Sequence, residues 1–293
     1  MPKNIRIIPR LDIKGPNLVK GIHLEGLRVL GKPEQYARYY YETGADELIY
    51  MDIVASLYNR NSLTDLIMKT AQETFIPLSV GGGLRTIEDI KSVLRSGADK
   101  VCLNTAAIRN PNIIREASRE FGSSTIVVSI EAMMQQDGQY LVYTDNGREY
   151  TGLEAIEWAK KAEELGAGEI MITSVDREGT GMGYDIALTR SIAEAVSVPV
   201  IACGGAGMLE HIDEVIAKGM ADAVAVSSIL HYDYIRHHQV ELDVSVEGNV
   251  EFLESGKRFS CIQSANLYDI KSYLFMKGHP CRYISKGAVS VGE

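Results

Sequence analysis

The sequence predicts a (β/α)8 TIM barrel that is built from two similar half-barrels and forms one domain. Three features predict it: a length of 293 residues, an alternation of apolar and amphipathic segments, and an internal repeat. α/β barrels of about 250 residues are common as single domains. A content of 45% hydrophobic and 24% charged residues is typical of a globular chain with a large core.

Apolar segments of strand length alternate along the chain with amphipathic segments of helix length. Eight of them are predicted strands: residues 6–13, 47–53, 77–80, 100–104, 125–131, 169–174, 199–203 and 223–227. Between them, residues 33–43, 86–95, 153–165 and 209–218 have the helical period. This alternation predicts a parallel sheet with crossover helices, which at this chain length commonly closes into a barrel.

The two halves of the chain resemble each other at an offset of about 120 residues. Residues 76–108 align with 198–230, 44–53 with 166–175, and 7–14 with 126–133. Because this period is too long for a solenoid, it indicates a duplicated half-barrel. We expect one domain over residues 1–293, with half-barrels at about 5–123 and 124–280 and a tail at about 283–293.

Composition and charge exclude several classes of protein. A net charge of −9 argues against nucleic acid as a partner, because phosphate backbones need a basic surface. The first residues lack the apolar segment of a signal peptide, and no window approaches the ~18 apolar residues of a membrane span, so we expect a cytoplasmic protein without membrane contact. The cysteines, which we expect to be free thiols, form no CxxC pair, and no His/Cys cluster has metal-site spacing. Neither a metal nor another cofactor is expected.

Glycine-rich turns follow the third and seventh predicted strands, at residues 81–83 and 204–207. Glycine lets backbone N–H groups approach the oxygens of a phosphate closely. Polar residues follow the fourth and eighth strands at the same level. One such turn alone is a plain tight turn, but two at symmetric positions favour a ligand with two phosphates. The candidate residues are Gly83, Asn104 and Thr105 in one half and Gly205, Ser227 and Ser228 in the other.

Two carboxyl groups, Asp12 and Glu131, end the first and fifth predicted strands and face each other across the barrel mouth. Between two phosphate sites, they could donate and remove protons at the middle of an elongated substrate. The alternative is a pair of caps or salt-bridge partners.

At the opposite end of the barrel, four charged residues stand at or near strand starts: Arg6, Glu47, Lys100 and Glu169. Pointing inward, they would form an alternating, neutral ring, since burial demands pairing. Taken alone, such a ring is a stabilising plug of the barrel floor.

Several motifs together resemble one family. The segments RLDIKGPNLVKG, VGGGLRTIED, GADKVCLNTAAI, TSVDREGTGMGYD and GGAG are similar to those of the cyclase subunit of imidazole glycerol phosphate synthase, HisF, from histidine biosynthesis. The resemblance covers residues 5–232 and resumes in the last helix.

This resemblance implies a mechanism and a partner. A glutaminase (HisH-type) subunit, bound as a heterodimer at the barrel floor, would release ammonia, which would pass the charged ring and travel through the barrel. At the mouth, ammonia would attack a bisphosphorylated formimino-aminoimidazole carboxamide ribonucleotide and give imidazole glycerol phosphate and an aminoimidazole carboxamide ribotide.

The resemblance also assigns roles to residues. Asp12 and Glu131 would be the catalytic acid and base, and the ring would be the ammonia gate. Asp99 would meet the glutaminase. Lys20 corresponds to a lysine on a mobile loop, and with Glu178 and Gly179 it would contact the substrate.

The sequence departs from the family pattern at four places. Glu131 and Glu178 stand where the family has Asp, and Cys203 stands where Ser is usual. About thirty extra residues, 233–262, follow the eighth strand; two alternating segments with a turn at residues 247–248 predict a β-hairpin on the active-site face.

These departures leave two alternatives open. A paralogue group associated with surface-polysaccharide genes would supply ammonia, with a sugar amidotransferase as partner, to convert a sugar N-acetyl group to an acetamidino group; Glu131 and the insertion favour it. A single-chain sugar isomerase of the same half-barrel ancestry needs no glutaminase, and the charged ring argues against it.

Overall fold

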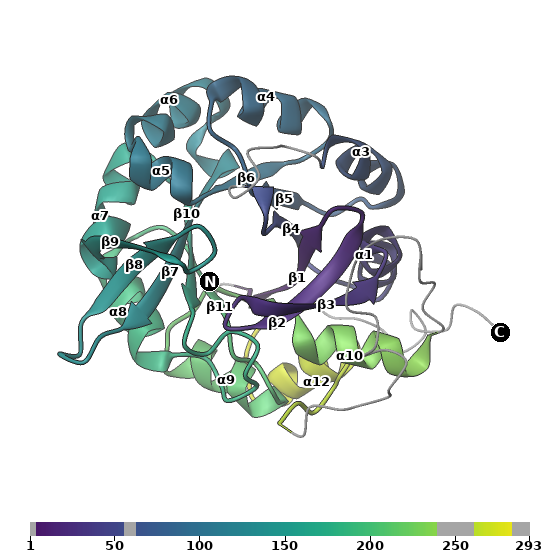
Figure 1. Ribbon diagram of the computed structural model, residues 1–293. Coiled ribbons are helices and arrows are strands. Elements are labelled where there is room, and N and C mark those ends of the chain that lie inside the picture. Colours follow the sequence, from purple (N-terminus) through teal and green to yellow (C-terminus); the bar gives the residue numbers. More distant parts are fainter. Residues whose placement is uncertain (1–3, 56–62, 239–260, 283–293) are drawn as a thin grey trace.

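The computed structural model describes residues 4–55, 63–238 and 261–282, and it confirms the predicted barrel. The parallel strands are β1 (Arg6–Lys14), β4 (Leu48–Asp52), β5 (Leu78–Gly81), β6 (Lys100–Leu103), β7 (Ile126–Met134), β10 (Glu169–Ser174), β11 (Val200–Cys203) and β12 (Ala223–Val226). Each pairs with the next, β12 pairs with β1, and β7 pairs with β10, so the sheet closes on itself. Figure 1 shows this ring of strands end-on.

Helices cover the outside of the barrel. They are α1 (Pro33–Glu42), α3 (Thr64–Glu73), α4 (Ile87–Arg95), α5 (Thr105–Arg109), α6 (Asn112–Phe121), α7 (Ala155–Leu165), α8 (Ile186–Ala195), α9 (Leu209–Ala217), α10 (Ser228–His237) and α12 (Leu267–Met276), with a 3-10 turn at Ser123–Thr125. Capping boxes begin α4 (Thr86 with Asp89) and α12 (Asn266 with Asp269). Among the described helices, none combines the length and the apolar character needed to cross a membrane.

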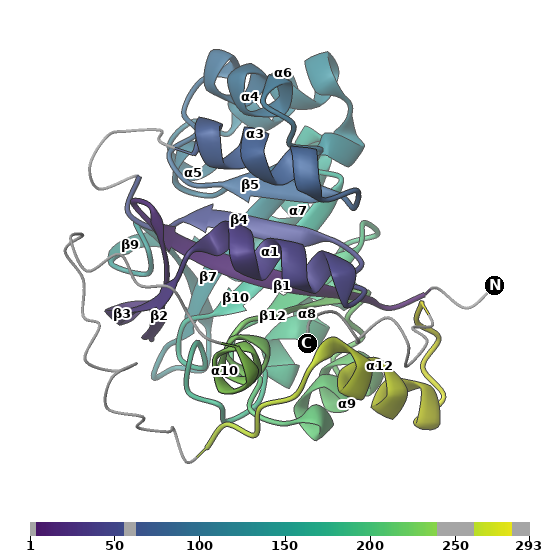
Figure 2. The ribbon, with the colours of Figure 1, turned by 90° about the vertical axis from the view of Figure 1, so that its right-hand side faces the viewer.

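Two β-hairpins at the mouth are absent from the sequence-based prediction. β2 (Asn17–Ile22) and β3 (Glu25–Gly31) follow β1, while β8 (Tyr140–Thr144) and β9 (Glu149–Glu154) follow β7. β2 and β8 each pair antiparallel with the long strand that precedes them. Figure 2 shows β2, β3 and β9 on the side away from the N-terminus. The helix predicted from residue 153 therefore begins only at Ala155, because the residues before it form β9.

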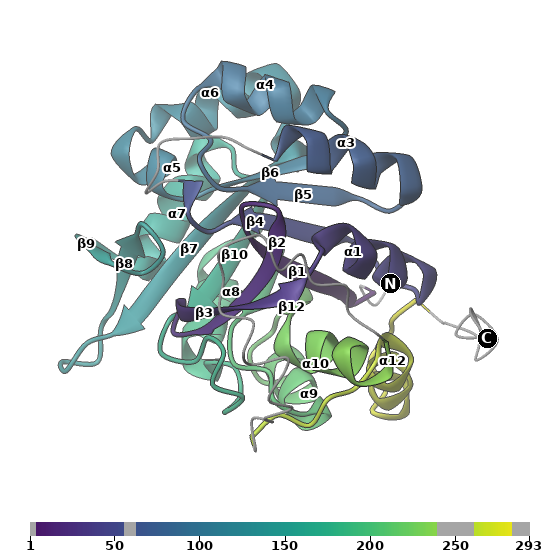
Figure 3. The ribbon, with the colours of Figure 1, turned by 45° about the vertical axis from the view of Figure 1, so that its right-hand side comes forward.

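The order of elements repeats in the two halves. In each, a nine-residue strand is followed by a hairpin, a helix and then three shorter parallel strands. This repetition agrees with the duplication inferred from the sequence, and Figure 3 shows the two hairpins at the same end of the barrel.

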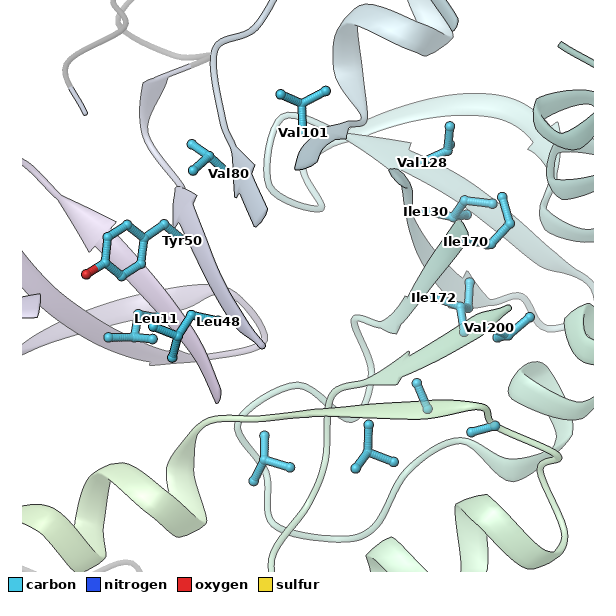
Figure 4. Packing of buried hydrophobic residues seen from close by; sticks show 14 of the residues in the cluster. Leu11, Leu48, Tyr50, Val80, Val101, Val128, Ile130, Ile170, Ile172 and Val200 are labelled. Carbon is cyan, nitrogen blue, oxygen red and sulfur yellow. The ribbon is translucent and has the colours of Figure 1, made fainter. Parts of the chain in front are cut away.

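Apolar side chains pack in two separate layers. The outer layer lies between strands and helices and includes Leu11, Tyr50, Ile130 and Ile172 (Figure 4). The inner layer fills the middle of the barrel and comprises side chains such as Ile8, Ile49, Cys102, Val127, Met171 and Ile201. The lumen between the charged floor and the polar mouth is therefore apolar.

The structure describes only the two ends of the insertion predicted at residues 233–262. Residues 233–237 continue helix α10, because their side chains extend its buried face with Asp233 and Tyr234. Residues 239–260, which include the predicted hairpin, and the tail at 283–293 lie outside the described residues.

His231 on α10 ties this helix to strand β1. Its ring is fully buried, and Nε2 donates to the carbonyl oxygen of Arg10 at 3.1 Å, while Nδ1 accepts from the Tyr40 hydroxyl at 2.7 Å. Burial, together with the nearby charge of Lys20, lowers the pKa of His231 to about 3. The ring is therefore neutral in the folded protein at any ordinary pH.

Stability should fall as the pH decreases from 6.5 towards 3, because the unfolded chain then binds a proton at His231 that the folded chain does not. His231→Gln should flatten this slope of the unfolding free energy, which amounts to about 2–5 kcal/mol over the whole window. Urea unfolding at several pH values measures it. His237→Gln, on the same helix but more than half exposed, is the matched control and should keep the wild-type slope. The same dependence of the unfolding free energy on pH in all three proteins would disprove the conclusion that buried, neutral His231 causes the slope.

Candidate active site at the barrel mouth

Asp12 lies at the buried end of β1 and is held by two cations. Its Oδ1 accepts a hydrogen bond from Nε of Arg10 at 2.9 Å, and its Oδ2 lies 3.6 Å from Nζ of Lys20. Burial disfavours the charged carboxylate, but the charges of Arg10 and then Lys20 outweigh it and lower the pKa of Asp12 below its ordinary value. Asp12 is therefore an ionised, oriented carboxylate that can accept a proton.

Glu131 occupies the equivalent end of β7 in a different electrostatic environment. Its Oε2 accepts a hydrogen bond from the backbone N–H of Gly147 at 2.8 Å, in the turn between β8 and β9. Burial raises the pKa of Glu131 to about 7, although Arg10, Gly147 and Asn104 act in the opposite direction. The negative charge of Asp12 adds to the increase. Near neutral pH, Glu131 can therefore donate a proton while Asp12 accepts one.

A cavity of about 190 Å³ lies beside Glu131 in the first half-barrel. Its wall contains the predicted phosphate residues Gly83, Asn104 and Thr105, and two further cations, Arg85 and Arg109. The buried Oδ1 of Asn104 has no hydrogen-bond partner among the described residues. A cavity with backbone glycines, amide and hydroxyl groups and two arginines suits a phosphate group.

The corresponding pocket in the second half-barrel is almost filled, with a volume of about 10 Å³. It brings together the predicted residues Lys20, Glu178, Gly179, Gly205, Ser227 and Ser228. Lys20 is only 3% exposed and forms a salt bridge with Glu178 inside this pocket. Burial alone would lower the pKa of Lys20, but Glu178 and Asp12 raise it. The two pockets thus occupy equivalent positions in the two half-barrels but differ in volume, and the second is lined by an ion pair.

The β2–β3 and β8–β9 turns meet over the mouth. Nδ2 of Asn146 donates to the carbonyl oxygen of Leu24 at 2.9 Å. The backbone N–H of His23 donates to the carbonyl oxygen of Glu178 at 2.8 Å. Gly179 has a φ of +75°, and a Cβ atom there would collide with the backbone of Gly21, so this close approach requires glycine. The hairpins therefore cover the two carboxyl groups from solvent.

The four predicted floor residues form a closed ring of ion pairs. Arg6 Nη1 lies 2.6 Å from Glu47 and 3.1 Å from Glu169, and Lys100 Nζ lies 3.1 Å from Glu47 and 2.7 Å from Glu169. The side chains are between 7% and 23% exposed. Burial would lower the pKa of Lys100, but Glu169 and Glu47 raise it, so both cations stay charged. The ring closes the floor below the apolar layer.

Asp99, the residue expected to contact a glutaminase, also has a local structural role. Its Oδ2 accepts a hydrogen bond from the backbone N–H of Leu78 at 2.8 Å, where β5 begins. Asp46 and Asp222 make the same bond to Ile7 and Val200. Asp99 therefore belongs to a repeated set of aspartates that bind the start of the neighbouring strand, and it remains exposed on the floor.

Arg10 is a residue of the site that the sequence interpretation did not single out. It is 2% exposed, lines the larger cavity and donates to Asp12. A signal was present: Arg6, Arg10 and Asp12 share the alternation of β1, so an inward Arg6 and Asp12 imply an inward Arg10. Gly147 was missed as well, because the β8–β9 turn that holds it was not predicted.

Two thiols face the lumen in protonated form. Burial raises the pKa of Cys102 to about 12 and also raises that of Cys203, against the opposing charge of Arg10. The described cysteines are free, as expected. No group of histidine, cysteine and carboxylate residues in the described part of the chain has the arrangement of a metal site.

Comparison with known proteins places the chain in a family. The family model described as "Histidine biosynthesis protein" matches residues 6–236. An imidazole glycerol phosphate synthase subunit HisF from Legionella pneumophila is 56% identical over 208 residues, which are 71% of this chain and 98% of the relative. A subunit HisF from Alkaliphilus metalliredigens (strain QYMF) is 44% identical over 246 residues, which are 82% of this chain and 98% of the relative. The chain therefore belongs to the HisF family of histidine biosynthesis proteins.

Proposed function

We propose that this chain is the cyclase subunit of an imidazole glycerol phosphate synthase. It uses ammonia to convert a bisphosphorylated formimino-aminoimidazole carboxamide ribonucleotide to imidazole glycerol phosphate and an aminoimidazole carboxamide ribotide. The observation that supports this best is a pair of carboxyl groups, one with a lowered and one with a raised pKa, between two glycine-lined pockets. The names of the relatives favour this function over acetamidino transfer to a sugar.

The substrate spans the mouth with one phosphate in each pocket. One phosphate binds beside Gly83, Asn104 and Thr105. The other binds beside Gly205, Ser227 and Ser228 once the ion pair of Lys20 and Glu178 has separated, and Lys20 then contacts this phosphate. The middle of the substrate then lies between Asp12, the base, and Glu131, the acid. Proton removal and proton donation on opposite sides of one reacting centre assist both cleavage and ring closure.

Ammonia reaches this centre through the lumen. The ion-pair ring stands at its floor, and the apolar layer above the ring, with Ile8, Ile49 and Met171, does not stabilise a charged ammonium ion. Neutral ammonia fits such a path, because it is small and carries no charge. The floor ring of Arg6, Glu47, Lys100 and Glu169 acts as the gate.

A glutaminase subunit docks on the barrel floor. Large apolar side chains are exposed there in loops that lead into strands: Phe75 before β5 is 78% exposed and Met220 before β12 is 50% exposed. Helix α12 ends with Phe275 and Met276, which are 68% and 76% exposed. After it, the backbone at Cys281 forms an isolated parallel β-bridge with Ile5, beside the start of β1. Exposed apolar groups around a charged centre are typical of a protein interface. Asp99 lies on the same face.

The purified protein should turn over the formimino ribonucleotide with ammonium salt alone, near neutral pH. NMR detection of imidazole glycerol phosphate measures the rate.

Asp12→Asn and Glu131→Gln should each reduce kcat by about 10²–10⁴, the usual contribution of a positioned acid or base. At a fixed concentration of neutral ammonia, the wild-type rate should fall as the pH rises through about 7, because Glu131 then loses its proton. Glu149→Gln, an exposed carboxyl at the start of β9, is the control. Absence of wild-type turnover would refute the proposed function.

Lys100→Met tests the gate. Without this cation, Glu47 and Glu169 retain only Arg6, so the ring opens and ammonia escapes. With the glutaminase bound, glutamine-dependent turnover should fall about tenfold, the effect of ~1.4 kcal/mol on a barrier, while ammonium-dependent turnover should persist. Lys160→Met, on the exposed face of α7, should change neither rate. An equal loss in both assays would assign Lys100 a structural role only.

A further inference from the structure

The side chain of Arg10 crosses the lumen of the barrel. Arg10 belongs to β1, but its Nη1 lies 3.1 Å from Sγ of Cys203 on β11 and 3.5 Å from Oγ1 of Thr173 on β10. In the sheet, β12 and β11 separate β1 from β10, so the guanidinium extends well into the interior. It lies above the apolar layer and lines the cavity that also contains Glu131.

Both ends of Arg10 are fixed. Its carbonyl oxygen accepts hydrogen bonds from Oγ of Ser227 at 2.9 Å and from Nε2 of His231. Its Nε donates to Asp12 at 2.9 Å, so the side chain carries a charge-assisted hydrogen bond to one of the two carboxyl groups. Because Arg10 and Asp12 are both buried, water screens the interaction between them little.

The internal repeat provides a comparison within one molecule. The alignment of residues 7–14 with 126–133 places Asp12 opposite Glu131 and Arg10 opposite Ser129. Ser129 is buried like Arg10 but uncharged. The two carboxyl groups therefore occupy equivalent places in equivalent half-barrels, and the residue two positions earlier is a cation in one half and a hydroxyl in the other.

We propose that Arg10 is the positioning residue that makes the two carboxyl groups inequivalent, holding Asp12 ionised and oriented as the base while Glu131 remains the acid. The inference deepens the proposed function, on which its catalytic consequence rests. Arg10 acts through Asp12, whereas Asp12 and Glu131 meet the substrate.

Other charged and titratable groups also lie near Asp12. Lys20 on β2 lies 3.6 Å from Asp12, but it is shared with Glu178 in the second pocket, where it would also pair with a bound phosphate. His231 on α10 is neutral, and Cys203 on β11 is a protonated thiol. The charge of Arg10 also favours the ionised form of Glu131, but among the described residues the side chain of Arg10 bonds to Asp12 and not to Glu131. Arg10 is thus the cation that stays beside Asp12 throughout a turnover.

Titration of Asp12 tests the proposal without any substrate. Protein labelled with ¹³C at the aspartate carboxyl groups would be followed by NMR against pH, with the Asp12 signal identified by its loss in Asp12→Asn. Wild-type Asp12 should stay ionised to unusually low pH. Arg10→Met, which keeps the length but removes the charge, should raise the midpoint by about 1–3 pH units, and Arg10→Lys should raise it less.

Two control variants distinguish the effect of the Arg10 charge from that of its packing contacts and from that of Lys20. Thr173→Val removes a contact of Arg10 and should leave the midpoint unchanged. Lys20→Met should shift it less than Arg10→Met does. If Arg10→Met does not fold, Arg10→Lys keeps the test decisive, because a wild-type midpoint in that variant would also overturn the proposal. A wild-type midpoint in Arg10→Met, or a larger shift in Lys20→Met, would overturn the proposal.

The kinetic consequence is measured separately. With ammonium and the formimino ribonucleotide, the acidic limb of the kcat/KM profile should move to higher pH in Arg10→Met, parallel to the NMR midpoint. A profile that keeps its acidic limb while the NMR midpoint moves would refute the positioning role. Wild-type protein that is inactive at every pH would count against the proposed function alone, because the NMR titration does not depend on turnover.

Discussion

Charged side chains inside a closed barrel must be paired, and this requirement governs the structure from floor to mouth. An unpaired charge in a lumen lined by Ile8, Ile49 and Met171 would lose its hydration without compensation. The floor meets the requirement with two cations and two carboxylates, each bonded to both opposite charges. The ring is neutral as a whole, so its stability does not require water or a bound ion.

At the mouth, two buried cations are paired with carboxyl groups. Arg10 and Lys20 both lie beside Asp12, and Lys20 also forms a salt bridge with Glu178. Glu131 forms no ion pair among the described residues, and burial raises its pKa to about 7. The difference between the two carboxyl groups therefore follows from which of them is paired with a cation.

The sequence predicted the barrel because most of its strands are short apolar runs and because the internal repeat aligns strands of one half with strands of the other. Both hairpins were missed because their second strands give a weak apolar pattern: β9 has no buried residue, and the first four residues of β3 are not buried. The two carboxyl groups, both glycine-rich turns and the charged ring at the floor were predictable from their positions at the ends or starts of the predicted strands. The filled second pocket was not, because it depends on how far the Lys20 and Glu178 side chains reach.

Duplication places two identical half-sites opposite each other, but an acid–base reaction needs two different groups. Exchanging Asp for Glu at one carboxyl position alters reach by one methylene and leaves the intrinsic acidity nearly unchanged. A change at the residue two positions earlier on the same strand alters the electrostatic environment and leaves the carboxyl group in place. In this chain Arg10 and Ser129 occupy those positions. The symmetry of the fold thus places both carboxyl groups at equivalent positions of the mouth, while the difference at one inward-facing position gives them different electrostatic environments.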